Sequence, residues 1–286
     1  EHDDPALTGR NDDAGEAKSA AQKQALADAI RAIDADVIGM QEIESRRALE
    51  SFVREYLPGE GYDHIVSIDV GHARGIENAV ISRFPLSNAR VWPGYPLGGT
   101  HPEKYGDKPN WNAGEPLRFR RSPLMVDVAV PPAAAENDEP YAFTIFVVHH
   151  KSGRYNDYWR EAEAETIVDF IGDFQRMDPS RNIVVLGDFN AELGEESVSI
   201  YRSELGMKHV LGHEERDAPE RLTHASSRAI DFILLNEAMS DEMVEGSAFV
   251  YATPLRPKDA DWRSTPPPAG YASDHMPVVV DLRPGD

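Results

Sequence analysis

The sequence predicts an α/β (α+β) fold in which mixed β-sheets are covered by helices. Amphipathic helical segments alternate with short apolar strands, and one pair of strands is separated only by a polar turn. Because hairpins give antiparallel pairs and helical crossovers give parallel pairs, a chain with both predicts mixed sheets. No internal repeat and no linker divides the 286 residues, so we expect a single domain over residues 1–286.

Periodicity places the elements of the first half of the chain. Apolar residues at helical spacing, among them Leu26, Ile30 and Ile33, predict the first helix, and Pro58-Gly59 ends the second. The elements expected here are helices at residues 16–34 and 44–57 and strands at 37–40, near 64–68 and near 77–82.

Residues 92–116 form a long stretch rich in Gly and Pro, which predicts a loop. Loops of this length in a compact domain are usually functional or mobile. The stretch holds the aromatic residues Trp92, Tyr95, Tyr105 and Trp111. Two interpretations stay open: these rings stack on a substrate, or they pin the loop to the core.

Strands and one long helix make up most of the second half. Alternating apolar residues at 124–130 predict a half-buried strand, which the polar turn 131–140 joins to a buried strand at 141–149 as an antiparallel hairpin. Downstream we expect a helix at 157–177, strands at 183–187, 229–235 and 276–282, and a second loop at 252–272.

The composition limits the kind of protein. Hydrophobic residues make up 41% of the chain, which is enough for a sizeable core, and no apolar run is long enough to cross a bilayer. The absence of cysteine excludes disulfides, thiolate zinc sites and cysteine nucleophiles. The first residues, Glu1 to Asp4, do not form a signal peptide. A chain from which one had been removed would begin in the same way, so we slightly favour a secreted or periplasmic protein.

The net charge of −21 is large and negative. An acidic surface repels a polyanion, so tight binding to long duplex DNA over a broad face is disfavoured. Such a charge is typical of a highly soluble or salt-adapted protein. The alternative is that metal ions or local arginine clusters mediate any contact with phosphate.

Polar clusters stand at the ends of two apolar strands. Gly187-Asp188-Phe189-Asn190 follows one strand, and Ser273-Asp274-His275 precedes another. Asp, Asn and His at the ends of these buried strands predict a single active site to which both strands contribute residues. This set of side chains suits a hard divalent cation and a water that attacks phosphorus.

Asp188 and Asn190 lie two positions apart, so their side chains point the same way if the backbone is extended. Asp188 can then orient or deprotonate water while Asn190 donates to a phosphate oxygen. Gly187 lets the backbone come close to a ligand. The alternative is an Asx turn that closes the strand.

The other candidates each have a plainer interpretation. Glu42 is either a metal ligand or an acid at a helix N-terminus. Asp274 could bind a metal and His275 could act as a general acid or base; the alternative is that the two form an ordinary surface pair. Asp231 enters a buried strand and needs a partner, for which a histidine is the expected type; the alternative is a capping residue.

Basic residues near strand ends are candidates for phosphate contacts. His149 and Lys151 face one way at the end of a strand, while His150 faces the other. Planar guanidinium groups suit phosphate, although ion pairing with the many acids is the plainer role for any one of them. The candidates are Arg118, Arg120 and Arg121, with Arg74 and Arg154 near other strand or loop ends; we assign Lys151, Arg121 and Arg154 to substrate binding.

The ordered set Gln41-Glu42, His149-x-Lys151-Ser152, Gly187-Asp188-Phe189-Asn190, Ile230-Asp231 and Ser273-Asp274-His275 resembles the endonuclease/exonuclease/phosphatase superfamily. The resemblance covers residues 18 to 282 and is specific because five motifs occur in order, each at a strand end. It implies a four-layer sandwich of two packed mixed β-sheets flanked by helices. It also implies a magnesium-dependent hydrolase, with manganese or calcium as alternatives.

The resemblance implies a role for each matching residue. Glu42 matches the metal-binding glutamate, and Asp274 matches a second acid near the metal. His149 matches the histidine that contacts the scissile phosphate, Asp188 the aspartate that positions water and Asn190 the amide beside it. Asp231 matches the acid that orients the essential histidine, which is His275.

The chain departs from the family pattern at its start. The family normally opens with a strand that carries an Asn near the metal, and no such strand precedes the first helix here. Asn11 is a poor substitute because no apolar run surrounds it. We therefore expect this strand to be lacking or replaced.

Together these points predict a metal-dependent phosphoesterase, most simply a nuclease-type phosphodiesterase that uses water attack. The partner is a phosphate ester, with nucleic acid as one candidate, and a monomer is expected. The alternatives are a phospholipid or phosphomonoester hydrolase of the same fold, or an inactive binding protein on this scaffold.

Overall fold

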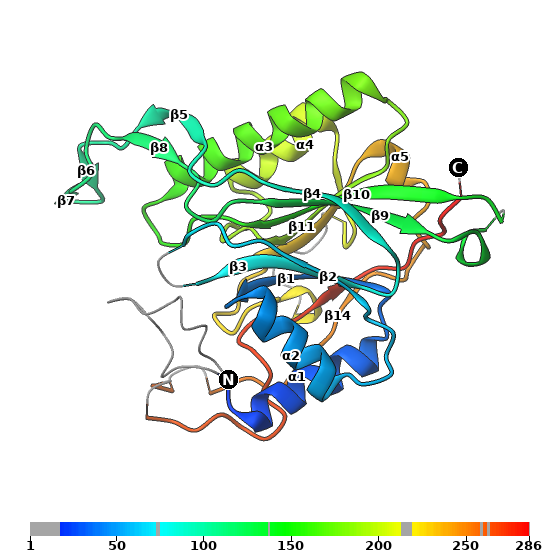
Figure 1. The fold of residues 1–286 in the computed structure, drawn as a ribbon. Helices are drawn as coiled ribbons and strands as arrows, with labels where there is room; N and C mark the ends of the chain where they lie inside the picture. The colour runs from blue at the N-terminus through cyan, green and yellow to red at the C-terminus, as the bar shows by residue number, and fades with distance from the viewer. Residues whose placement is uncertain are drawn as a thin grey trace.

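Two β-sheets lie face to face, and helices cover the outer face of each, so that the molecule has four layers (Figure 1). The computed structural model describes residues 18–72, 75–136, 138–212, 219–257, 260–261 and 264–285. The layered arrangement predicted from the sequence is confirmed. No helix among these described residues is long and apolar enough to span a bilayer.

The larger sheet has six strands in the order β12-β13-β11-β10-β9-β4. The sheet is mixed. Strands β10 and β11 run parallel, and the other neighbouring strands that the structure describes in this sheet run antiparallel. The expected hairpin of β9 and β10 is present. The strands are β4 (Leu86–Val91), β9 (Leu124–Val130), β10 (Tyr141–His149), β11 (Ile183–Asp188), β12 (Lys208–His209) and β13 (Asp231–Leu235).

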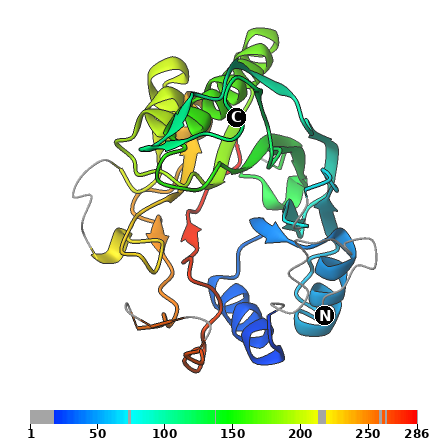
Figure 2. The same ribbon diagram turned by 90° about the vertical axis from the view of Figure 1, so that its left-hand side faces the viewer.

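The smaller sheet is antiparallel in the order β1-β3-β2, and a separate two-stranded ladder, β14-β15, lies on the same side of the larger sheet (Figure 2). In that view β15 (red) and β1 (blue) lie next to each other. These strands are β1 (Val37–Ile43), β2 (His64–Ser67), β3 (Glu77–Ser82), β14 (Phe249–Val250) and β15 (Val278–Val279).

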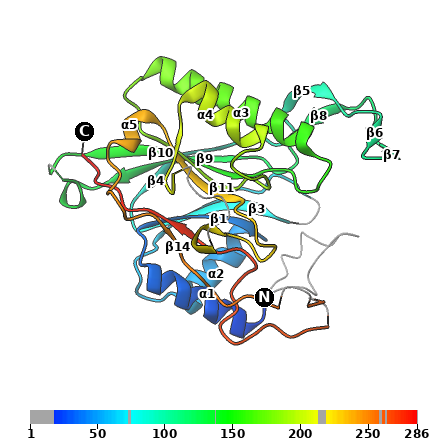
Figure 3. The same cartoon turned by 180° about the vertical axis from the view of Figure 1, so that it is seen from behind.

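Helices cover both outer faces, as the view from behind also shows (Figure 3). The long helix α3 packs against α4 on the larger sheet, and α1 and α2 lie on the smaller one. Ser19 begins α1 with a capping box shared with Gln22, which satisfies free backbone N–H groups at the helix start. The helices are α1 (Ala20–Ile33), α2 (Arg46–Tyr56), α3 (Asp157–Met177), α4 (Glu196–Leu205) and α5 (Glu237–Ser240).

Three apolar clusters hold the four layers together. One fills the space between α3, α4 and the larger sheet, with Phe146 and Ile171 fully buried. A second lies between the two sheets around Val80 and Val126, and a third joins α1 and α2 to the smaller sheet around Ile30. Burial of these side chains, at about 25 cal/mol per Å² of apolar surface, is the main force that stacks the layers.

The segment predicted as a loop at 92–116 is more ordered than expected. Backbone hydrogen bonds within it form two small hairpins, so the loop prediction is wrong for these residues. Trp92 is buried and stacks on Phe170 at 4.6 Å, so this ring holds the segment to the core. Trp111 is 99% exposed, and stacking of exposed rings on a substrate stays a prediction. The pairs are β5 (Pro96–Thr100) with β8 (Pro116–Arg118) and β6 (Lys104–Tyr105) with β7 (Lys108–Pro109).

A buried carboxyl in β3 makes stability depend on pH. Glu77 is 3% exposed, and its Oε2 atom has no hydrogen-bond partner among the described residues. Burial raises the pKa of Glu77 to about 7; the backbone of Val70 opposes the shift, and the charge of Asp69 adds to it. The folded state therefore binds more protons than the unfolded state between about pH 4.5 and pH 7, so this contribution to the unfolding free energy falls as the pH rises through that window.

We predict that Glu77→Gln raises the unfolding free energy at pH 8 by about 1–2 kcal/mol, less than the full shift would give because solvent screens part of it. Urea denaturation at pH 4, 6 and 8 measures this, and the difference from wild type should vanish at pH 4. The matched control is Glu165→Gln on the exposed face of α3. Parallel pH curves for wild type and Glu77→Gln would contradict the assignment.

Candidate active site

The register of three adjacent strands aligns three of the predicted site residues. His149 pairs with Asp188 across the parallel β10-β11 ladder, and Asp188 pairs with Asp231 across the antiparallel β11-β13 ladder. All three lie at the same end of the larger sheet. The separation between His149 Nε2 and Asp188 Oδ2 is 3.4 Å.

Gly187 makes this alignment sterically feasible. Its φ is +139°, and a Cβ atom there would lie 2.0 Å from the carbonyl oxygen of Val148 on β10. No side chain fits at that distance. Gly187 thus allows a close approach to the neighbouring strand, and an approach of a ligand to this backbone stays a prediction.

Asp188 and Asn190 form an Asx turn, so the extended arrangement expected for them is wrong. The backbone N–H of Asn190 donates to Asp188 Oδ1 at 2.7 Å, and Asn190 adopts φ +50°. The side-chain amide of Asn190 donates to Asp188 Oδ2 at 2.8 Å and to the carbonyl oxygen of His150 at 3.1 Å. Both of its N–H bonds are used in this way, and Asn190 therefore fixes the orientation of the Asp188 carboxylate.

His275 is the histidine partner of Asp231. Its Nδ1 lies 2.9 and 3.0 Å from the two carboxylate oxygens of Asp231, and Nε2 makes no hydrogen bond among the described residues. Burial lowers the pKa of His275, but the hydrogen bond and charge of Asp231, with the charges of Asp188 and Asp274, outweigh it and raise that pKa to about 9. At neutral pH the ring is an imidazolium that can donate a hydrogen bond.

Asp188 is more basic than an ordinary aspartate. Burial, with a smaller contribution from the charge of Asp231, raises the pKa of Asp188 to about 7, while His275, the backbone of Asn190 and Arg121 act in the opposite direction. A carboxylate whose pKa lies near neutral pH is well matched to accepting a proton from water. Asp188 and His275 thus have pKa values displaced in the directions that suit a base and a donor.

Arg121 reaches the site from the segment before β9. Its guanidinium donates to His149 Nε2 at 2.5 Å and to the carbonyl oxygen of His150 at 3.2 Å. Burial, followed by the charge of Arg121, lowers the pKa of His149 well below its ordinary value, so the ring is neutral and can accept this bond. His149 therefore positions a guanidinium group beside Asp188.

Glu42 projects from a β-bulge. The pairing of β1 with β3 shifts register between Met40 and Ile43, and Glu42 adopts φ +57°. A bulge of this kind re-aims side chains at the end of a strand. The carboxylate is 60% exposed and lies 4.0 Å from His149 Nε2, at the same end of the molecule as Asp188.

His224 belongs to the site but was not identified from the sequence. Its Nε2 lies 3.4 Å from Asp274 Oδ2, and its ring packs on that of His275 at 4.5 Å. The hydrogen bond from His224 is the largest of the effects that hold the pKa of Asp274 well below its usual range. The Thr-His pair before β13 resembles an ordinary loop, and only the bridge between His224 and His275 reveals its place.

The donor set fits a hard divalent cation. Burial lowers the pKa of Lys18, and the negative charges of Asp274 and Glu42 both oppose that shift, so the two carboxylates lie near one ammonium group. Both are more than half exposed. Their oxygens are the ligands that Mg²⁺ prefers, since it keeps several waters and needs only one or two carboxylates. Among the described residues, the groups whose ligand atoms all lie within 4.8 Å of one another are Asp188, Asp231 and His275, and His224, Asp274 and His275; Glu42 belongs to neither.

The remaining basic candidates each have a local partner of their own. The ammonium of Lys151 donates to the carbonyl oxygen of Ser152 and lies 5.7 Å from the centre of the Trp159 ring. Arg154 lies over Tyr155, and Arg118 donates to the carbonyl oxygen of Gly94. Substrate binding by Lys151 and Arg154 stays a prediction, and Arg74 and Asn11 lie outside the described residues.

Comparison with known proteins adds an independent finding. A family model described as the Endonuclease/Exonuclease/phosphatase family matches residues 10–275. The human Nocturnin catalytic domain with bound sulfate anion is similar at 17% identity with a TM-score of 0.61, over 92% of this chain and 86% of that chain. A mannosyl-6-phosphatase of Bacteroides thetaiotaomicron is similar at 17% identity and a TM-score of 0.57, over 91% and 90% of the two chains. Truncated TDP2 of Caenorhabditis elegans is similar at 13% identity and a TM-score of 0.57, over 90% and 88%. No curated protein matches the chain at a significant level.

Proposed function

The chain belongs to the endonuclease/exonuclease/phosphatase family, and from this premise we propose that it is a metal-dependent phosphodiesterase of nuclease type. The observation that carries the proposal is the row of His149, Asp188 and Asp231 across three strand ends, with His275 held against Asp231. A base, a cationic donor and a guanidinium meet there beside two exposed carboxylates. These groups can position a water for attack on phosphorus and stabilise the charge that develops on the phosphate oxygens.

Each side chain has a defined task in the proposed reaction. Asp188, oriented by Asn190, aligns the attacking water and takes its proton. His275 donates from Nε2 to a phosphoryl oxygen, and Asp231 keeps the ring in the required orientation and tautomer. Arg121, held by His149, stabilises the negative charge that develops on phosphate oxygens.

Glu42 and Asp274 are the residues that would hold the cation, with magnesium as the proposed metal and manganese or calcium as alternatives. When bound, such an ion supplies Lewis-acid polarisation of phosphoryl oxygens and charge neutralisation. The acidic surface makes this local positive charge necessary, because the net charge of −21 otherwise repels phosphate.

A diester that contains bases fits the rim of the site. Asn156 connects Ser152, next to Arg121, with the hydroxyl of Tyr105 on the β6-β7 hairpin. Tyr105 packs edge-on against the exposed Tyr155, and Trp111 on the same segment is almost fully exposed. Such rings can stack on bases of a single strand, which also avoids the repulsion expected for a long duplex. A phospholipid or phosphomonoester substrate is the alternative.

The direct test is hydrolysis of bis-p-nitrophenyl phosphate. We expect turnover with Mg²⁺, loss of turnover with EDTA, and recovery when Mg²⁺ is added in excess. A panel at fixed Mg²⁺ then compares single-stranded and duplex DNA, RNA, sphingomyelin and phosphoinositides, and single-stranded nucleic acid should react fastest. Absence of hydrolysis of every ester with every divalent metal would indicate an inactive binding protein instead.

Substitutions within the row test the assigned roles. His275→Ala and Asp188→Asn should each lower kcat/KM at least ~100-fold, in the range that a key acid, base or charge-stabilising group contributes. Steady-state kinetics on the same diester measure the effect, with Asp169→Asn on the exposed face of α3 as the control. Turnover close to wild type in either site variant would remove that residue from the mechanism.

A further inference from the structure

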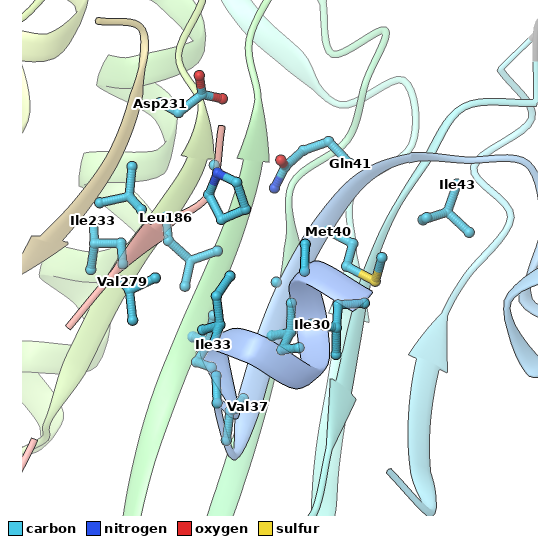
Figure 4. Close-up of a pocket in the computed structure, with 18 of the residues that line it drawn as sticks. Ile30, Ile33, Val37, Met40, Gln41, Ile43, Leu186, Asp231, Ile233 and Val279 are labelled. Atoms are coloured by element: carbon cyan, nitrogen blue, oxygen red, sulfur yellow. The ribbon is translucent and has the colours of Figure 1, made fainter. Parts of the chain in front are cut away.

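The two faces of the larger sheet carry different groups at its active-site end. Leu186 and Ile233 point toward the smaller sheet and line a cavity of about 1120 Å³, with Asp231 at its active-site end (Figure 4). His149 lines the same cavity. The next residue, His150, lies on the opposite face, because side chains alternate along a strand, and there it meets side chains of α3 and α4.

His150 is the middle member of a buried, hydrogen-bonded set of three side chains. Its Nδ1 atom lies 3.1 Å from Oε2 of Glu163 on α3, and its Nε2 atom lies 3.1 Å from the hydroxyl of Tyr201 on α4. None of the three residues is more than 2% exposed, so a substrate cannot reach them. We call Tyr201, His150 and Glu163 the buried triad.

The partners determine where the protons of the buried triad lie. An ionised carboxylate only accepts hydrogen bonds, so Nδ1 of His150 carries a proton and donates to Glu163. In a neutral ring Nε2 then accepts from the hydroxyl of Tyr201. Glu163 Oε2 also accepts from the backbone N–H of Lys151 at 2.8 Å. Because each of these donors has its own acceptor, the bonds hold the ring in one orientation.

The main chain of His150 makes the bonds that orient the active site. Its N–H donates to the carbonyl oxygen of Asp188 at 2.9 Å. Its carbonyl oxygen accepts from the guanidinium of Arg121 at 3.2 Å and from the side-chain amide of Asn190 at 3.1 Å. Arg121 in turn bonds to His149, and Asn190 bonds to the carboxylate of Asp188. A rotation of this one peptide group would therefore displace both Arg121 and Asn190.

Further contacts hold the same segment against α3 and against β11. Arg160 of α3 donates to the carbonyl oxygen of Lys151 at 3.3 Å. The ring of His150 packs on the fully buried ring of Phe189, with 5.4 Å between the ring centres. Phe189 directly precedes Asn190, so the ring of His150 joins the ends of β10 and β11 on the face opposite to the active site.

A buried carboxylate is not the group that stability favours here. Glu163 Oε1 has no hydrogen-bond partner among the described residues, and burial of an ionised group costs free energy. Apolar side chains of similar volume often give equal or greater stability at such positions. They would allow several orientations of the His150 ring, whereas directional hydrogen bonds allow one. The retained cost indicates a role in positioning.

We propose that the buried triad positions Arg121 and Asn190 for phosphodiester hydrolysis by holding the peptide carbonyl of His150 in place. The inference rests on the proposed function and adds to it three positioning residues, which touch neither substrate nor metal. They act through the main chain of the strand end, from the face of the sheet that the helices cover.

Substitutions of Glu163 separate its hydrogen bonds from the stability of the helix. Glu163→Gln keeps an oxygen that accepts from His150 and Lys151, whereas Glu163→Met fills the space without such an acceptor. With bis-p-nitrophenyl phosphate and Mg²⁺, Glu163→Met should lower kcat about 10- to 100-fold and leave KM within ~2-fold, because displaced catalytic groups lose rate. Glu163→Gln should keep at least ~half of the wild-type kcat. The control Ile171→Ala, in the apolar core of α3, should lower Tm and leave kcat unchanged.

A second readout involves no catalysis. Nitrogen-15 NMR should show His150 protonated at Nδ1 and not at Nε2 in the wild type and in Glu163→Gln. The side-chain amide protons of Asn190 should exchange with solvent at least ~10-fold faster in Glu163→Met than in those two proteins. Where Glu163→Met is poorly folded, Tyr201→Phe takes its place: it removes one oxygen, and it should also lower kcat and speed this exchange.

Wild-type kcat together with wild-type exchange at Asn190 in Glu163→Met and Tyr201→Phe would overturn the proposal. Equal losses of kcat in Glu163→Met, Glu163→Gln and Ile171→Ala would also overturn it, because the stability of α3 would then explain the effect. If the wild type hydrolyses no ester, the proposed function fails by itself, and the exchange of the Asn190 amide still decides whether the buried triad holds that side chain.

Discussion

The register of β10, β11 and β13 is the constraint on which the site depends. It places His149, Asp188 and Asp231 side by side at one end of the larger sheet. Arg121, Asn190 and His275 each bond to one of these three residues. Since side chains alternate along a strand, a slip of one residue would turn these groups to the opposite face. Gly187 fixes the distance between β10 and β11 at this end, because the carbonyl of Val148 occupies the space of a Cβ atom.

The candidate catalytic and metal-binding residues lie where the regular pairing of the strands ends. Glu42 and Asn190 both adopt positive φ, one in a bulge and the other in an Asx turn. Backbone conformations of this kind are costly for residues other than Gly and persist only when the surrounding structure enforces them. Here the sheet enforces both conformations, and the carboxylates of Glu42 and Asp188 both lie near Nε2 of His149. Burial raises the pKa of Asp188, and the hydrogen bond and negative charge of Asp231, with the charges of Asp188 and Asp274, raise the pKa of His275.

Strong periodicity made the long elements predictable from sequence. The helix at Asp157–Met177 and the strand at Tyr141–His149 have the bounds that the pattern predicts. Elements with weak patterns were missed: β4 is an edge strand whose middle is exposed, and α4 is short and carries serines. The strand expected at 276–282 is shortened to Val278–Val279 because β14 is its only described partner.

The same division applies to the site. Residues at strand ends could be identified because a polar side chain next to an apolar run is recognisable in the sequence, as with Asp188 after its run and His275 before its run. The bond between Arg121 and His149 and the position of His224 could not be predicted from the sequence. Each depends on chain segments that meet only after folding. For Asn190, the sequence is compatible with both an extended strand end and an Asx turn, and only the folded structure shows that its amide bonds to Asp188.

The central claim is that side chains from position 42 to position 275 surround one divalent cation. The most direct measurement is anomalous X-ray scattering from crystals soaked in Mn²⁺ as a probe for the magnesium site. We predict one strong peak in contact with the carboxylates of Glu42 and Asp274, within reach of a phosphate that also touches His275. A peak bound by His224, Asp274 and His275 without Glu42, or no peak at this end of the sheets, would contradict the account.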